Sequence, residues 1–536
     1  MERLVRRLLP ALATGLVWLL VASLGGLVHS TTRNAEPHPP GTDTTVTEDA
    51  SAHSAGSAQS LESQHAGSQT PDNHSTSSRA AEGAAERVAG GTTPGSALRL
   101  RTCLVPEALV WDTDGELSVA VSALGDDSSE GPLLLGINED QPVAPASVVK
   151  LFTAVAALEV LGPDFRFHTR VRAGETPGDV WLIGGGDVTL TRAAGANYYD
   201  SESHLERLAA SAVATAEGVT IQRVWVDDSR YARFPDWDES WRPGSAALGY
   251  VAPITALQVD GDRDQPAVRL SPRSTDPTSR ATQWFLDAVE RTGQARPEIV
   301  ESGSASGLVS ASGLARAPEG RLLAEVSSAP LSQLVQIMLI DSDNSLAEVI
   351  AREVALALDP TGELGISPGE AILRAVEGVF RRSAGVSDDS LEGAVIHDGS
   401  GLSPLSGLSP QAVVSLLWLV EHTAQWKQVE SSLPVSGQSG SLRQRYRVVA
   451  SEMQGLVRAK TGSIRGTRSL AGYLETPPVQ PEDAPEDEVS AGERLAFSIV
   501  LSGNQVSNAS RDDIDRLVAA LAQCGENLAD WNDPNN

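Results

Sequence analysis

The pattern of hydrophobic and polar residues changes twice within the first hundred residues. An apolar run extends from Leu8 to about Val28 behind a basic start, and its length approaches the roughly 20 residues that cross a bilayer. We expect residues 1–30 to be an export signal or a retained membrane anchor. Residues 31–99 are mostly small and polar, so they bury too little apolar surface to offset the entropy of ordering, and we expect a disordered linker.

From residue 100 onward, β-like runs and helical stripes predict ordered structure. Residues 100–170 and 325–536 are predicted to form two parts of one domain. The segment Ser147–Leu161 is apolar almost all round, which predicts a helix buried on every side. The other helices are predicted at Leu331–Asp341, Leu346–Leu358, Gly369–Arg382 and Arg511–Gln523, and the strands at Glu107–Thr113, Leu117–Leu124, Leu133–Asn138, Leu456–Lys460, Arg468–Glu475 and Arg494–Leu501.

Residues 171–324 differ from both flanking parts. Short β-like stretches alternate there with turns rich in Gly, Pro and Asp, and helices are predicted near Ser203–Ala216 and Thr282–Arg291. The strands are predicted at Val180–Ile183, Val224–Val226 and Val268–Leu270. We expect an inserted β-rich region within a chain of the α/β (α+β) class.

The charge and the scarcity of metal-binding patterns exclude several functions. With 41 basic and 70 acidic residues the net charge is −29, which argues against a nucleic-acid partner and against binding to anionic lipid. The sequence has no Cys-x-x-Cys pair and no His-Glu-x-x-His, so we expect no metal site. Cys103 and Cys524 lie near the two ends of the ordered part, and in an exported protein we expect a disulfide between them; two free thiols are the alternative.

Only three of the 41 basic residues are lysines: Lys150, Lys427 and Lys460. Arginine keeps its proton in proteins, whereas a buried lysine can lose its proton and act as a base. Lys427 lies in no motif and is expected to be an ordinary surface residue. Lys150 and Lys460 each lie in a short motif with hydroxyl side chains, which favours a chemical role.

Ser147 and Lys150 are three residues apart at a predicted helix start, which places both side chains on one face. A serine hydroxyl is a weak nucleophile until a base takes its proton, and lysine can be that base when burial or nearby positive charge lowers its pKa. The apolar helix supplies the burial. Lys460 is expected to supply the charge while it keeps its own proton. The alternative, an exposed pair on a helix surface, is disfavoured by the apolar residues that follow.

Two further motifs complete the set. Ser342-Asp343-Asn344 lies between two apolar helices, where such a tripeptide alone is most often just a polar turn. Combined with the first motif, Ser342 is a candidate to pass a proton to a leaving amine. Asn344 is a candidate to hold a substrate amide or to hydrogen-bond Lys150.

The third motif, Lys460-Thr461-Gly462-Ser463, ends a predicted strand. The glycine permits a substrate to approach the strand edge closely. The lysine and the two hydroxyls are candidates to bind a carboxylate.

The order Ser-x-x-Lys, Ser-Asp-Asn, Lys-Thr-Gly is the set found in β-lactamases and penicillin-binding proteins. The chain thus resembles the active-site serine penicillin-recognising enzymes. The 195 residues from Ser147 to Ser342 exceed the gap in class A β-lactamases. Over residues 100–536 the chain most resembles the D-alanyl-D-alanine carboxypeptidases of the S13 peptidase family, the class C low-molecular-mass penicillin-binding proteins, which carry extra domains at this point. Further matches are Asp398–Ser403, Leu433–Gly437 and Val457–Gly462.

The resemblance implies a fold and a mechanism. The fold is a transpeptidase/β-lactamase-like catalytic domain with a central antiparallel sheet and a helical subdomain. Lys150 would deprotonate Ser147, which attacks a D-alanyl-D-alanine bond, and the backbone N–H groups of Ser147 and Ser463 would bind the oxyanion. Ser342 would then pass a proton to the leaving D-alanine, and water would hydrolyse the acyl-enzyme.

The resemblance also implies partners and a location. Asn344 would bind the substrate amide, and the substrate carboxylate would be held by Lys460, Thr461, Gly462 and Ser463. The substrate would be a peptidoglycan peptide and the inhibitors β-lactams, with no cofactor. The protein would be extracytoplasmic, either secreted or membrane-anchored. Removal of a terminal D-alanine and cleavage of a cross-link use the same residues, so both activities stay open.

Three other functions remain as alternatives. A β-lactamase or esterase of the same superfamily is disfavoured by the large insertion. A non-catalytic wall-binding protein is disfavoured by the intact motifs. A Ser-His-Asp hydrolase is disfavoured because the sequence has no Gly-x-Ser-x-Gly and few histidines beyond residue 100: His168, His204, His397 and His422.

We predict that Lys150→Arg abolishes acylation by labelled penicillin, because the guanidinium keeps the charge but cannot accept the proton of Ser147. Intact-mass analysis after incubation with penicillin measures the adduct. Lys427→Arg, the same exchange at the lysine outside the motifs, should leave acylation unchanged. An adduct that forms on Lys150→Arg at the wild-type rate would rule out an amine base.

Overall fold

The computed structural model describes residues 115–125, 130–195, 197–300, 316–383, 385–477 and 492–525. The predicted signal or anchor (1–30), the predicted linker (31–99), the predicted strand Glu107–Thr113 and Cys103 lie outside these residues. None of the helices in the described ranges is long and apolar enough to span a bilayer.

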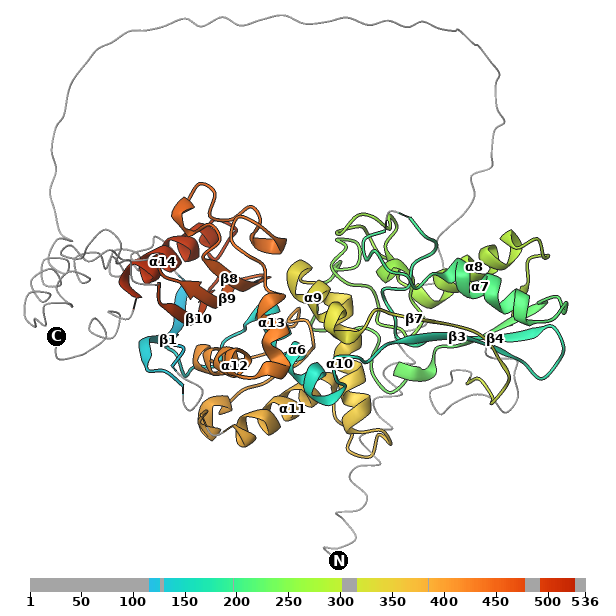
Figure 1. Ribbon diagram of the computed structural model, residues 1–536, viewed down its shortest axis with the longest axis horizontal. Helices are drawn as coiled ribbons and strands as arrows, with labels where there is room; N and C mark the ends of the chain where they lie inside the picture. The colour runs from blue at the N-terminus through green and yellow to red at the C-terminus, as the bar shows by residue number, and fades with distance from the viewer. Residues whose placement is uncertain are drawn as a thin grey trace, which may run out of the picture. The chain divides into compact units, whose positions relative to one another are not determined.

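A five-stranded antiparallel sheet joins the beginning and the end of the described chain (Figure 1). Its central pair is β1 with β10, in register from Glu116 opposite Ser502 to Ala123 opposite Leu495. The strand order is β2-β1-β10-β9-β8, with β1 at Glu116–Ala123, β2 at Leu133–Ile137, β8 at Val457–Ile464, β9 at Thr467–Glu475 and β10 at Arg494–Ser502. The central antiparallel sheet expected from the resemblance is therefore confirmed.

Helices cover both faces of this sheet because its side chains alternate between two cores. Ala120 packs in the core with α12 (Pro410–His422), whereas Val119 and Val121 pack in the core with α14 (Ser510–Cys524). The stripe predicted for the last helix is the face that α14 buries: Ile514, Leu517, Val518 and Leu521.

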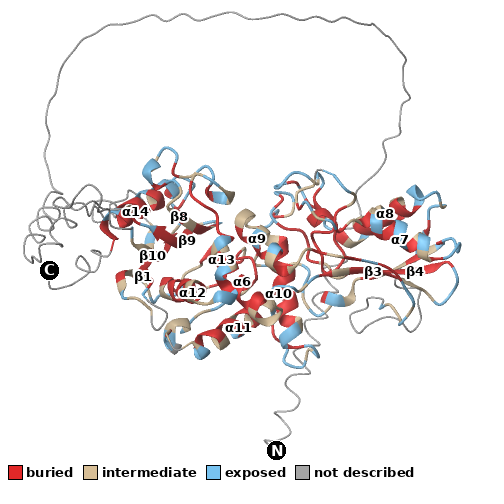
Figure 2. Ribbon diagram, viewed as in Figure 1, coloured by how far each residue is buried: buried red, intermediate tan, exposed pale blue. Residues whose placement is uncertain are grey.

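A helical cluster builds the second part of this unit around α6 (Val149–Val160). Every residue of α6 from Val149 to Leu158 is buried, as the all-round apolar sequence predicts (Figure 2). Its neighbours are α9 (Leu331–Asp341), α10 (Asn344–Leu358), α11 (Pro368–Arg382) and α13 (Lys427–Ser431).

A second five-stranded sheet, in the order β6-β5-β4-β3-β7, includes strands from the predicted inserted region and extends a few residues beyond 171 and 324. The strand β3 pairs antiparallel with β4 and β7, whereas β4, β5 and β6 are parallel, and α7 (Leu205–Thr215) and α8 (Pro277–Arg291) pack in its core. The strands are β3 at His168–Ala173, β4 at Asp179–Ile183, β5 at Arg223–Asp227, β6 at Glu298–Val300 and β7 at Leu322–Ser327. The exact limits at 170 and 325 stay a prediction.

One predicted strand is wrong. Val268–Leu270 forms tight turns, in which the Val268 N–H donates to the Gln265 carbonyl and the Ser271 N–H to the Val268 carbonyl. The alternating pattern was too short to outweigh the prolines at 266 and 272, which cannot donate to a strand ladder. The sequence also failed to predict β3, β6, β7, α12 and α13.

We predict that Leu517→Ala in α14 lowers the free energy of unfolding by about 2–5 kcal/mol, because it leaves a cavity between the helix and the sheet. Arg516→Ala, on the exposed face of the same helix, should change stability by less than about 0.5 kcal/mol. Denaturant titrations of the two variants measure this difference. Equal losses would contradict the packing of α14 on the sheet.

Candidate active site

The candidate nucleophile lies at the start of the buried helix α6. Ser147 is part of a short 3-10 turn, Ala146–Val148, that leads directly into α6. Three residues later the Lys150 Nζ donates a hydrogen bond to the Ser147 Oγ at 3.1 Å. Lys150 is fully buried while Ser147 is partly exposed, so the hydroxyl faces a space that a substrate can enter and the amine lies behind it.

Two glycines let neighbouring segments pack against this turn. A Cβ on Gly401 would lie 1.9 Å from the Ala146 carbonyl oxygen, and one on Gly462 would lie 2.7 Å from the Pro145 carbonyl oxygen. Sequence reasoning explained Gly462 by the approach of a substrate. In the structure the residue also lets β8 lie against the turn that carries Ser147, and the approach of a substrate stays a prediction.

The Lys150 amine is held by two oxygens besides Ser147. Its Nζ donates to the Asn344 Oδ1 at 2.7 Å and to the Ser400 carbonyl at 2.5 Å. The predicted contact between Asn344 and Lys150 is thus present. Burial lowers the pKa of Lys150 to about 8, while the carboxylates of Asp398, Glu348 and Asp343 act in the opposite direction. With this pKa, roughly a tenth of the amine is neutral at pH 7 and can accept a proton, and the neutral share grows as the pH rises.

Glu348 is linked to the same amine through the backbone of one residue, Ser400, and sequence reasoning missed it. Its Oε1 accepts the Ser400 N–H at 2.9 Å, and the Ser400 carbonyl in turn accepts from Lys150. Burial, reinforced by Asp398, raises the pKa of Glu348 to about 7, against the effect of its ion pair with Arg352 at 3.0 Å. The available signal was a pair of opposite charges, four residues apart, inside a helix that is mostly apolar.

A hydrogen bond joins the second motif to the third. Lys460 is fully buried on β8, and its Nζ donates to the Ser342 Oγ and to the Thr461 carbonyl, both at 2.9 Å. Burial lowers the pKa of Lys460 well below its usual value, and the positive charges of Lys150 and Arg269 lower it further. Lys460 forms no ion pair with a carboxylate among the described residues.

The two expected pKa values therefore need correction. We expected Lys460 to keep its proton and to lower the pKa of Lys150. Instead, burial lowers the pKa of both amines, and the positive charges of Lys150 and Arg269 lower that of Lys460 further. Three carboxylates favour the charged form of Lys150, whereas no carboxylate of the described residues does so for Lys460. Lys427 behaves as expected: it is half-exposed and pairs with Glu421 at 2.9 Å.

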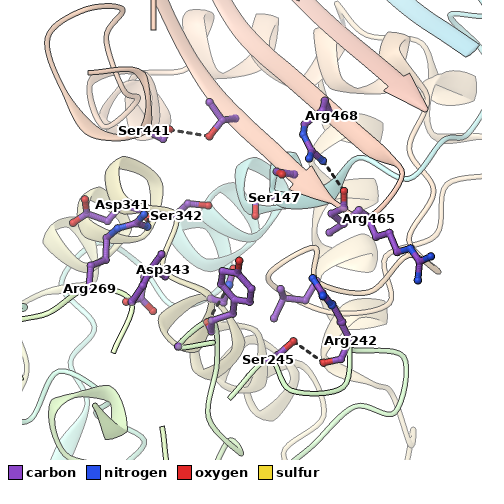
Figure 3. Close-up of a pocket in the computed structure, with 18 of the residues that line it drawn as sticks. Ser147, Arg242, Ser245, Arg269, Asp341, Ser342, Asp343, Ser441, Arg465 and Arg468 are labelled. Atoms are coloured by element: carbon purple, nitrogen blue, oxygen red, sulfur yellow. Dashed lines mark hydrogen bonds between the residues drawn. The ribbon is translucent and has the colours of Figure 1, made fainter. Parts of the chain in front are cut away.

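These groups open into one cavity of about 930 Å³. Figure 3 shows Ser342, Asp343 and Arg269 on one side of Ser147 and Arg242, Arg465 and Arg468 on the other. Of the predicted site residues the cavity is lined by Ser147, Ser342, Asn344, Thr461 and Ser463. Lys150, Lys460 and Gly462 lie beneath its surface.

The cavity also contains residues that the motifs did not indicate. The Thr461 Oγ1 donates to the Ser441 Oγ at 2.8 Å, and the Asn344 Nδ2 donates to the Tyr250 carbonyl at 3.1 Å. Ser441 follows the Leu433–Gly437 match in a stretch of alternating Ser and Gly, which carries little signal. Tyr250 comes from the inserted region, whose contribution no spacing argument predicts.

Cys524 ends α14 and is disulfide-bonded. Because Cys103 lies outside the described residues, the pairing of these two cysteines stays a prediction.

A partly exposed serine beside a buried, readily neutralised lysine, on this sheet and helical cluster, defines an active-site serine hydrolase of the penicillin-recognising type. A family model described as "D-Ala-D-Ala carboxypeptidase 3 (S13) family" matches residues 109–307 and 270–523. The chain belongs to this family, as its motifs predicted.

Two relatives and one solved structure agree with this assignment. Carboxypeptidase DacB of Mycolicibacterium smegmatis is 34% identical over 393 residues, 72% of this chain and 76% of that protein. The D-alanyl-D-alanine carboxypeptidase of Actinomadura sp. (strain R39) is 29% identical over 450 residues, 70% of this chain and 77% of that protein. Penicillin binding protein 4 from Haemophilus influenzae has the same fold, with a TM-score of 0.58 at 17% identity over 78% of this chain and 97% of that one.

We predict that kcat/KM for a thiolester substrate without a terminal carboxylate rises with pH with a half-point near pH 8, because only neutral Lys150 can accept the proton of Ser147. A substrate without a carboxylate avoids any effect of the charge on Lys460. Glu348→Gln should move the rise to lower pH, because it removes a negative charge that favours the charged amine while keeping an oxygen for the Ser400 N–H. The same half-point in both proteins would contradict this assignment of the base.

Proposed function

We propose that the protein cleaves D-alanyl-D-alanine bonds of peptidoglycan stem peptides through an acyl-enzyme on Ser147, and that penicillin blocks it by acylating the same serine. The observation that carries the proposal is that two hydrogen-bonded serine–lysine pairs lie at one cavity. Ser147 bonds with Lys150, and Ser342 bonds with Lys460. One pair suits removal of a proton from the nucleophile, and the other suits delivery of a proton to the leaving group.

The chemistry begins at Ser147. Neutral Lys150 takes the hydroxyl proton as the Oγ attacks the carbonyl carbon between the two D-alanines. The backbone N–H groups of Ser147 and Ser463 are proposed to stabilise the oxyanion. When the C–N bond breaks, Ser342 gives its proton to the departing nitrogen and is resupplied by Lys460. Water then attacks the ester carbonyl and gives one proton to Lys460 by way of Ser342. As the ester C–O bond breaks, Lys150 returns its proton to the Ser147 oxygen, so that the acyl group leaves as a carboxylic acid and both lysines regain their starting states.

Recognition depends on the carboxylate that the leaving D-alanine carries. Lys460 is a buried amine without an anionic partner among the described residues, so a substrate carboxylate supplies the missing negative charge and raises the pKa of Lys460. The hydroxyls of Thr461 and Ser463 offer further hydrogen bonds to that carboxylate. Gly462, which has no side chain, lets β8 lie close to the turn that carries Ser147. The Asn344 amide is proposed to bind the substrate amide on the other side of the scissile bond.

The substrate implies where the protein works. Peptidoglycan lies outside the cytoplasmic membrane, so the proposed function requires an extracytoplasmic enzyme. Residues 1–30 are proposed to supply the export signal or the anchor, and residues 31–99 the tether between that segment and the catalytic unit.

We predict that the purified protein removes D-alanine from pentapeptides of isolated peptidoglycan, cleaves peptide cross-links, or does both. Mass analysis of the soluble fragments separates the two activities, because loss of a single residue and separation of a dimer give different products. Ser147→Ala should remove both, whereas Ser432→Ala, at a buried serine outside the cavity, should retain them. No product from wild type, or the same products from Ser147→Ala, would contradict the proposed function.

A further inference from the structure

The inserted region contacts the turn that carries the second motif. Three residues of this turn, Asp341, Asp343 and Asn344, form hydrogen bonds with side chains or backbone of this region. The contacts are Arg269 Nη1 to the Asp341 carbonyl (3.1 Å), Arg263 Nη2 to Asp343 Oδ2 (3.1 Å), Tyr199 OH to Asp343 Oδ2 (3.0 Å) and Asn344 Nδ2 to the Tyr250 carbonyl (3.1 Å). Figure 3 shows Arg269 beside Asp341 at this edge of the cavity.

The turn needs such support because its backbone is strained. Ser342 has φ 57° and ψ 44°, the left-handed conformation, where a residue with a Cβ costs roughly 1–3 kcal/mol. It lies between the end of α9 and the start of α10. Such a conformation persists only where its surroundings enforce it, and this conformation aims the Ser342 hydroxyl at Lys460.

Asp343 divides its two oxygens between two tasks. The Oδ1 accepts the Leu346 N–H at 2.9 Å and so caps α10, whereas the Oδ2 accepts from Arg263 and Tyr199. Loss of Arg263 would therefore leave the helix cap in place. What would be lost is one of the two hydrogen bonds to the Oδ2 of Asp343, the residue next to Ser342.

Arg263 is itself rigidly held. It is 1% exposed, its Nη1 donates to the Asp260 carbonyl at 3.0 Å, and its guanidinium stacks over the Tyr198 ring at 3.9 Å from the ring centre. A planar group fixed in this way transmits its position to the carboxylate that it binds.

We propose that Arg263 is a positioning residue, through which the inserted region holds Asp343 and thereby keeps the Ser342 hydroxyl in line between Lys460 and the leaving group. This inference rests on the proposed role of Ser342 in proton delivery. It gives the inserted region a part in catalysis and not only in stability.

Two substrates that differ only in their leaving group distinguish a positioning role of Arg263 from a structural role. An amide nitrogen must be protonated as it leaves, whereas a thiolate departs without a proton. A displaced Ser342 therefore slows cleavage of amides far more than cleavage of thiolesters with the same acyl group. Partial unfolding reduces both rates by the same factor.

The test compares Arg263→Gln with wild type on a D-alanyl-D-alanine peptide and on the matching thiolester. We expect kcat/KM for the peptide to fall about 100-fold, as small displacements of catalytic groups can cause, while the thiolester retains most of its rate. Arg263→Lys should recover only part of the loss, because an ammonium cannot reproduce the planar contact. Tyr199→Phe, which removes one hydrogen bond from the same oxygen, should give a smaller loss of the same selectivity.

Arg445→Gln is the matched control, because it also breaks a largely buried ion pair, with Asp515 at 2.6 Å, at a residue that does not itself line the cavity. It should leave the ratio of peptide to thiolester rates unchanged. Equal losses on both substrates in Arg263→Gln and in Tyr199→Phe would overturn the inference. If wild type cleaves neither substrate, the proposed function fails first, so the two failures are distinguishable.

Discussion

The burial of two lysine amines within one site is the constraint on which the rest of the structure depends. An amine removed from water loses hydration, and each of these two is compensated differently. Carboxylates at Asp398, Glu348 and Asp343 support the charge on Lys150, whereas no carboxylate among the described residues pairs with Lys460. Burial and the carboxylates together leave Lys150 with a pKa of about 8, so that it can lose its proton and act as a base near neutral pH. Lys460, which has no such carboxylate, can instead receive a negative charge from the carboxylate of a substrate. The apolar helix α6 and the strand β8 provide the burial.

Much of this arrangement was predictable because it is local in sequence. The three-residue spacing of Ser147 and Lys150 and the all-round apolar helix after them describe a buried nucleophile and base. The regular strands and the helical stripe of α14 follow from periodicities of two and 3.6 residues. Motif order then indicated the family, which the family match and the relatives confirm.

What the sequence could not predict depends on contacts between distant segments. Glu348 acts on Lys150 through the backbone of Ser400, and no spacing rule links these three positions. The relative pKa values of the two lysines depend on where carboxylates lie in space. The strands β3 and β7 contain charged residues and show only a weak hydrophobic pattern. Their burial depends on the neighbouring strands and helices, which their own sequences do not indicate. Likewise, the contribution of Arg263 to a turn 80 residues later becomes visible only in three dimensions.

The pairing of β1 with β10 has a consequence for how the chain reaches its folded state. These strands are neighbours in the middle of the first sheet, yet they lie near opposite ends of the described residues. During synthesis β1 therefore emerges long before its partner exists, and one edge of it stays open while the inserted region and the helical cluster form. Contacts between such distant segments make folding slow and expose unpaired strand edges to aggregation. A chaperone that shields the early strand until the last hundred residues appear would therefore affect the yield of this protein more than it affects its final stability.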